Sequence, residues 1–95
     1  MTGTNKLKQL PEFINVIDFD GTIKTISYRE LKHHEEYIIE DNVGYRLLHN
    51  EYSIEEILNY EKQARNEWKN LKNALRENPT ILLKIDPITE RFVIA

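Results

Sequence analysis

The 95-residue sequence contains no cysteine, and this absence excludes several kinds of chemistry at once. Without thiols the protein can form no disulfide, no thiolate zinc site and no cysteine nucleophile. A cysteine-free chain suits a reducing compartment, so we expect a cytoplasmic protein.

Long apolar segments are also lacking. No continuous apolar run approaches the roughly 20 residues that a membrane-spanning helix needs. Residues 1–9 are polar, with two lysines and no apolar stretch of the kind found in secretion signals. We therefore expect no membrane association and no export. Residues 1–9 are predicted to form a mobile tail, followed by a single domain over residues 10–95.

Glycine and alanine are scarce, whereas isoleucine, asparagine, lysine, glutamate and tyrosine are common. AT-rich genes produce this usage, which suggests a low-GC bacterium, or a phage or other mobile element living in one. The formal net charge of −3 argues against a generally basic nucleic-acid-binding protein, although the distribution of charge matters more than its sum.

A short acidic motif stands out near the N-terminus, in the run VIDFDGTI from Val16 to Ile23. An apolar strand followed by Asp-x-Asp-Gly-Thr resembles the first signature of haloacid-dehalogenase-type phosphatases. The resemblance implies that Asp18 would attack phosphorus, that Asp20 would handle the leaving-group proton, and that both would help to hold Mg²⁺; Thr22 also matches. That family further needs a serine or threonine, a lysine and a second acidic cluster on later strands of a parallel sheet.

The rest of the chain is too short for such a sheet, because each added parallel strand needs a crossover of a dozen or more residues. A β-hairpin explains the same residues, with strands over 13–18 and 22–27 and a turn through Phe19-Asp20-Gly21. Asp-Gly between apolar runs is a strong hairpin signal, since glycine takes the positive φ that the turn needs. A three-residue loop aligns apolar partners across the strands: Ile17 with Ile23, and Ile14 with Ile26.

The middle of the chain is harder to interpret. Ser27-Tyr28-Arg29-Glu30 has the spacing of a helix capping box, so residues 28–35 form either a short helical turn or a continuation of the strand. Residues 36–48 predict a second hairpin, with a turn through Asp41-Asn42-Val43-Gly44.

The C-terminal half gives clearer signals. Ser53 begins a second capping box, and apolar residues then recur at helical spacing, which predicts a helix over residues 54–77 with Trp68 at the centre of its buried face. Residues 81–85 and 91–94 predict a third hairpin around Pro87. The order of elements predicts a small α+β domain, in which an antiparallel sheet of hairpins carries one long helix on one face.

Two adjacent histidines and two glutamates, at positions 33–36, invite a metal-site interpretation. Adjacent side chains diverge on a helix or a strand, and the ligand spacing that makes metal motifs specific is missing. We therefore predict no metal, no cofactor and no catalytic residue, and expect a protein that is not an enzyme.

The predicted long helix carries a basic stripe, whose five cations are spaced three or four residues apart: Lys62, Arg65, Lys69, Lys72 and Arg76. Like charges at this spacing repel one another, so something should offset them. One interpretation is internal, with Glu35, Glu36, Glu40 and Asp41 lying alongside. The other is an anionic partner bound by the stripe.

These patterns predict a protein-binding regulator or inhibitor that uses the basic stripe or the edge of the sheet. The alternative is a nucleic-acid-binding module, in which Tyr45, Arg46 or Trp68 stacks on bases beside the stripe. A phosphatase fragment that uses Asp18 is the third interpretation.

Overall fold

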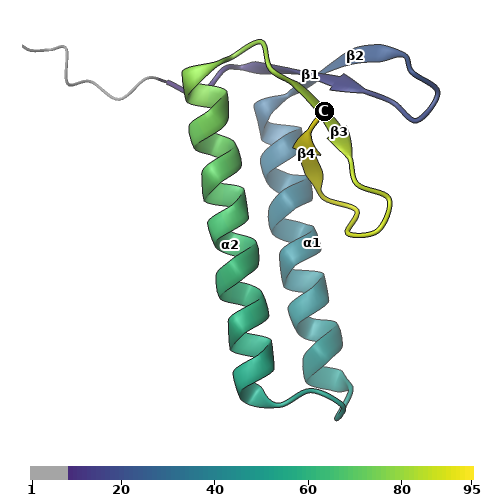
Figure 1. The fold of residues 1–95 in the computed structure, drawn as a ribbon, viewed down its shortest axis with the longest axis vertical. Coiled ribbons are helices and arrows are strands. Elements are labelled where there is room, and N and C mark those ends of the chain that lie inside the picture. Colours follow the sequence, from purple (N-terminus) through teal and green to yellow (C-terminus); the bar gives the residue numbers. More distant parts are fainter. Residues whose placement is uncertain (1–8) are drawn as a thin grey trace, which may run out of the picture.

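The computed structural model describes residues 9–95, and the predicted tail over residues 1–9 therefore falls almost wholly outside the described part. Six elements follow one another: β1 (Phe13–Ile17), β2 (Ile23–Ser27), α1 (Tyr28–Leu48), α2 (Ile54–Glu77), β3 (Leu82–Ile85) and β4 (Phe92–Ile94). The sheet lies across one end of an antiparallel pair of long helices, and the other end of the helix pair projects beyond the sheet (Figure 1). The predicted α+β class is confirmed.

The first hairpin has the predicted register, with Ile17 opposite Ile23 and Ile14 opposite Ile26. Its turn is closed by a hydrogen bond from the Asp18 N–H to the Thr22 carbonyl at 2.8 Å. Gly21 has φ +88°, the left-handed conformation that the sequence predicts at this position. Alternation along β1 buries Ile14 and Val16 on the face that the helices cover.

Gly21→Ala is expected to lower the free energy of unfolding by about 1 kcal/mol, because a side chain disfavours the left-handed conformation. Space is not the reason, since an added Cβ would meet nothing within 4 Å. The matched control is Gly44→Ala inside α1, where the space is equally open and φ is not positive. That control should raise the melting temperature. A thermal scan in which Gly21→Ala leaves the melting temperature unchanged or raises it would contradict the turn.

The predicted hairpin over residues 36–48 is wrong, because these residues form the second half of the 21-residue helix α1. Ser27 caps this helix by accepting the Glu30 N–H at 3.1 Å, which favours the helical interpretation of residues 28–35. The buried face repeats at Leu31, Glu35 and Ile39. Its middle member is a carboxylate, so the apolar periodicity of the helix is interrupted in the sequence.

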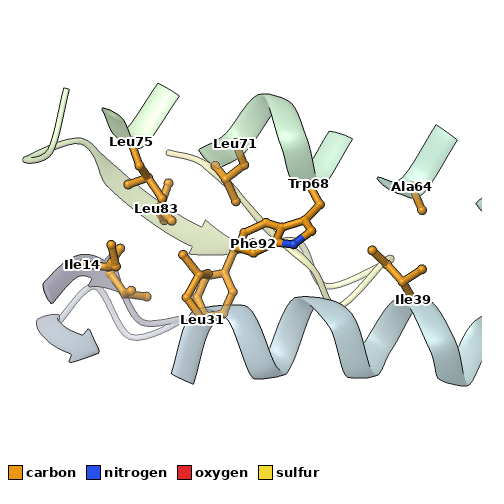
Figure 2. Packing of buried hydrophobic residues seen from close by; sticks show 10 residues of the cluster. Ile14, Leu31, Ile39, Ala64, Trp68, Leu71, Leu75, Leu83 and Phe92 are labelled. Atoms are coloured by element: carbon orange, nitrogen blue, oxygen red, sulfur yellow. The ribbon is translucent and has the colours of Figure 1, made fainter. Parts of the chain in front are cut away.

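Helix α2 has the predicted bounds and a complete capping box between Ser53 and Glu56. It buries Trp68 together with four other residues of its inner face: Ile57, Ala64, Leu71 and Leu75. Four of these side chains, those of Ala64, Trp68, Leu71 and Leu75, meet α1 and the sheet in one core (Figure 2).

The C-terminal hairpin forms as predicted, but its first strand, β3, pairs with β1 in parallel. The strand order is β2-β1-β3-β4, so the sheet is mixed and not wholly antiparallel. Two helices separate β2 from β3, and a crossover of this length can return the chain beside β1 in the parallel direction. The predicted wholly antiparallel sheet is therefore wrong, because β1 and β3 pair in parallel.

Candidate functional site

The acidic motif near the N-terminus shapes a turn. Asp18 forms an ion pair with Lys24 at 3.2 Å, and the Asp20 carboxylate accepts the Thr22 N–H at 2.9 Å. This hydrogen bond holds the pKa of Asp20 below its usual value. Strand β1 leads directly into an antiparallel partner, whereas the phosphatase signature would lead into a parallel crossover. The geometry gives the phosphatase resemblance no support beyond the motif itself.

The His-His-Glu-Glu cluster separates into different environments on α1. The His33 ring stacks near Tyr37, while His34 Nε2 donates to the Glu90 carbonyl at 2.6 Å. Glu35 is fully buried, and Glu36 is half-buried. Within residues 9–95, no group of three or more histidine, aspartate or glutamate side chains is placed to hold a metal ion.

Glu35 instead belongs to a buried charge network that joins α1, α2 and β4. Its carboxylate accepts the Phe92 N–H at 2.9 Å and the Arg91 Nε–H at 3.4 Å. Arg91 is 8 % exposed and also donates to Glu67 at 2.8 Å and to the Ala64 carbonyl at 3.2 Å. Burial raises the pKa of Glu35, although the Phe92 N–H and the Arg91 charge oppose that rise.

This network has no local signal in the sequence, because Glu35 and Arg91 lie 56 residues apart. Glu35 was expected among polar surface residues, and Arg91 only as the first residue of the last strand. Three of the five guanidinium donors are satisfied by groups from two helices, so the network fixes β4 against the helix pair.

The predicted basic stripe is real as a geometric feature of α2. Lys62, Arg65 and Lys69 are exposed, and Lys72 and Arg76 are half-buried. The opposite flank of α2 carries Tyr60 and Glu67, which contact Arg46 and Arg91 respectively. The stripe therefore lies on the flank of α2 that faces away from the β3–β4 hairpin.

Each cation of the stripe has a different local environment. Arg65 pairs with Glu61 at 3.0 Å, Lys72 lies 5.0 Å from the centre of the Trp68 ring, and Arg76 donates to the Asn73 side chain. Lys62 and Lys69 form no ion pair or side-chain hydrogen bond within residues 9–95. Only part of the charge is offset by close contacts.

The acidic residues expected to neutralise the stripe form no ion pair with it within the described residues. Glu35 binds Arg91 instead. Burial raises the pKa of Tyr28, the Glu36 charge adds to that rise, and the Arg76 charge opposes it. Glu40 and Asp41 line a groove elsewhere on α1.

Two large apolar side chains extend the stripe toward the free end of the helix pair. Ile54 is 67 % exposed and Leu58 59 % exposed, and the steps from 54 to 58 to 62 are four residues each. We call the seven residues together the α2 row: Ile54, Leu58, Lys62, Arg65, Lys69, Lys72 and Arg76. The apolar end of this row was missed, because the exposure of an aliphatic side chain depends on what packs against its helix.

Comparison of the chain with protein-family models, curated proteins and solved structures gave no match, so its function has to be inferred from the residues and their geometry. In the part of the chain that the structure describes, no helix has the length and apolar character needed to cross a membrane.

Proposed function

We propose that this chain is a small cytoplasmic regulator or inhibitor, not an enzyme, that docks onto an acidic protein surface through the α2 row. The observation that carries the proposal is the continuity of this row, in which two exposed aliphatic side chains lead into five cations on one flank of α2. Burial of exposed aliphatic side chains supplies binding energy, and the charges beside them supply orientation and speed of association.

The charge of the row contrasts with that of the whole molecule. The row carries five cations, whereas the chain has a formal net charge of −3, so the remaining surface is strongly acidic. Such a charge separation orients the protein as it approaches an acidic partner. Two copies that met row to row would repel each other.

Nucleic-acid binding is the weaker proposal. Trp68 is 4 % exposed and buried in the core, so its ring cannot stack on a base. The guanidinium of Arg46 lies 3.8 Å from the centre of the Tyr60 ring on the opposite flank of α2, which removes a second stacking group from the stripe. Phosphate binding would also leave Ile54 and Leu58 without a role.

A direct test measures binding of two labelled probes by fluorescence anisotropy: a synthetic helix of leucine and glutamate at helical spacing, and a DNA duplex. We expect the wild-type protein to bind the acidic helix more tightly than the duplex. Lys62→Glu with Lys69→Glu should weaken helix binding at least about tenfold, and Leu58→Ser should weaken it as well. Arg29→Glu with Lys84→Glu makes the same change of charge at exposed positions outside the row and should have little effect.

Two other outcomes would contradict docking of the α2 row onto an acidic protein surface. If the duplex binds more tightly, with an affinity that falls steeply with salt and does not change in Leu58→Ser, the row is a phosphate-binding surface. If neither probe binds, or if the two charge-reversed proteins behave alike, the row is not a docking surface.

A further inference from the structure

A groove that is acidic and apolar, in contrast to the basic α2 row, runs along α1. It is shallow, has a volume of about 460 Å³, and is lined by six residues: Tyr37, Glu40, Asp41, Gly44, Tyr45 and Leu48. Leu48 is 84 % exposed, and more than half of each tyrosine is exposed. Large apolar side chains and two carboxylates therefore share one unpartnered surface of the helix.

Gly44 lies inside α1, and the fold itself gives no reason for a glycine there. An added Cβ would meet nothing within 4 Å, and the backbone is helical. Glycine weakens a helix interior relative to alanine, so the position lowers stability with no packing contact in return. Its effect is to leave the helix backbone uncovered in the groove, which allows a second helix to approach closely.

The spacing of the lining residues also suits a helix. Tyr37, Asp41, Gly44 and Leu48 follow at steps of four, three and four, so they form one row along α1. Rows of this kind accept the side chains of a second helix between them. No cation lines the groove, and Glu40 and Asp41 form no ion pair within residues 9–95. The groove thus fits an apolar helix that carries positive charge.

The chain itself contains a helix of this kind, since the α2 row joins Ile54 and Leu58 to Lys62, Arg65 and Lys69. We propose that the α1 groove of one copy receives the α2 row of a second copy, with aliphatic side chains against Tyr37, Tyr45 and Leu48 and lysines against Glu40 and Asp41. The proposal rests on the docking role of the row and names one acidic partner for it. The contact joins two different surfaces, so each added copy leaves a groove and a row free.

Self-association of this kind would regulate the protein. A row that is occupied by a second copy is closed to any other acidic partner, and an acidic helix would compete with the groove for the same residues. Dilution or a tighter partner would release single copies.

Sedimentation of the purified 95-residue chain over a hundredfold range of concentration tests the proposal. We expect the average mass to rise with concentration at low salt and to fall as salt is added. Glu40→Lys with Asp41→Lys makes the groove basic, and Lys62→Glu with Lys69→Glu makes the row acidic. Either protein alone should sediment as a monomer. Mixed in equal amounts they should associate again, because the acidic groove of the row variant fits the basic row of the groove variant, and the two reversed surfaces also fit each other.

Substitutions at Gly44 distinguish an effect on self-association from an effect on folding. Gly44→Ala should raise the melting temperature, and Gly44→Leu should remain folded but lose self-association at least tenfold because its side chain fills the groove. Arg29→Glu with Lys84→Glu should associate like the wild type.

A wild-type protein that is monomeric at every concentration would refute self-association, and so would reversed variants that still associate or a mixture that does not. If a monomeric wild type still binds the leucine–glutamate helix, the docking role of the row survives and only its self-partner is wrong.

Discussion

Arg91→Met is expected to lower the free energy of unfolding by about 3–5 kcal/mol, as removal of one partner from a buried ion pair does in other proteins. Glu35 is fully buried and would keep the Phe92 N–H but lose its cation. Glu67 is affected less, because half of its side chain is exposed to water. Urea denaturation at neutral pH measures the loss.

A double-mutant cycle shows whether the loss comes from the stranded carboxylate. Glu35→Leu alone should also destabilise, since it leaves the guanidinium of Arg91 with fewer acceptors in a buried position. The double variant Glu35→Leu with Arg91→Met removes both charges, and its loss should be smaller than the sum of the single losses. Additive losses would show that the two residues act independently.

The pH dependence of the free energy of unfolding is a second test of the same network. Burial raises the pKa of Glu35 above its ordinary value of 4.5, so the folded protein binds this proton more tightly than the unfolded chain does. The contribution of Glu35 to stability is therefore fully present below the unfolded pKa and is lost as pH rises through the folded pKa. Relative to Glu35→Gln, the wild type should gain stability as pH falls from 7 toward 4.5. Arg91→Met should extend that window to higher pH, because a cation that lowers the pKa is gone.

The network also explains why the second half of α1 was not predicted as a helix from the sequence. A buried carboxylate at position 35 breaks the apolar repeat of α1 between Leu31 and Ile39. Its partner Arg91 lies in the last ten residues of the chain, so no local window contains both. Asp41-Asn42-Val43-Gly44 has turn chemistry, yet Asn42 uses its side chain to donate to the Ile38 carbonyl within the helix at 2.9 Å. Tertiary contacts outweighed local preference in this segment.

Where local chemistry and packing favour the same structure, the sequence alone was sufficient to predict the element. The first hairpin depends on Gly21 and on a register that segregates isoleucines, and α2 depends on a capping box and an uninterrupted apolar stripe. The cations of the α2 row were visible for the same reason, because helical spacing alone places them on one side. Exposure of Leu58 and the groove around Gly44 could not be predicted, since both depend on which faces of the helices are left without a packing partner.

Trp68→Ala is expected to cost about 3–5 kcal/mol of unfolding free energy, a large share of the roughly 5–15 kcal/mol that holds a small domain together. The indole is 4 % exposed and packs in the core that both helices share with the sheet. Its ring stacks near Tyr28, with centroids 6.4 Å apart, and the Lys72 ammonium lies over it. Loss of the ring would leave a cavity at the junction of three elements, and far-UV circular dichroism during urea denaturation would record the loss.

Trp68→Phe separates packing from hydrogen bonding at the same site. The Trp68 Nε1–H is buried and has no acceptor within residues 9–95, so the native protein bears the desolvation of an unpaired donor, which is worth about 1–3 kcal/mol. Phenylalanine keeps most of the ring and removes that donor, so we expect Trp68→Phe to lose about 1 kcal/mol or less. The native fluorescence of Trp68 should have a blue-shifted maximum that moves to longer wavelength on unfolding. A water-exposed emission maximum, or a loss in Trp68→Phe as large as in Trp68→Ala, would show that the indole is not packed in this core.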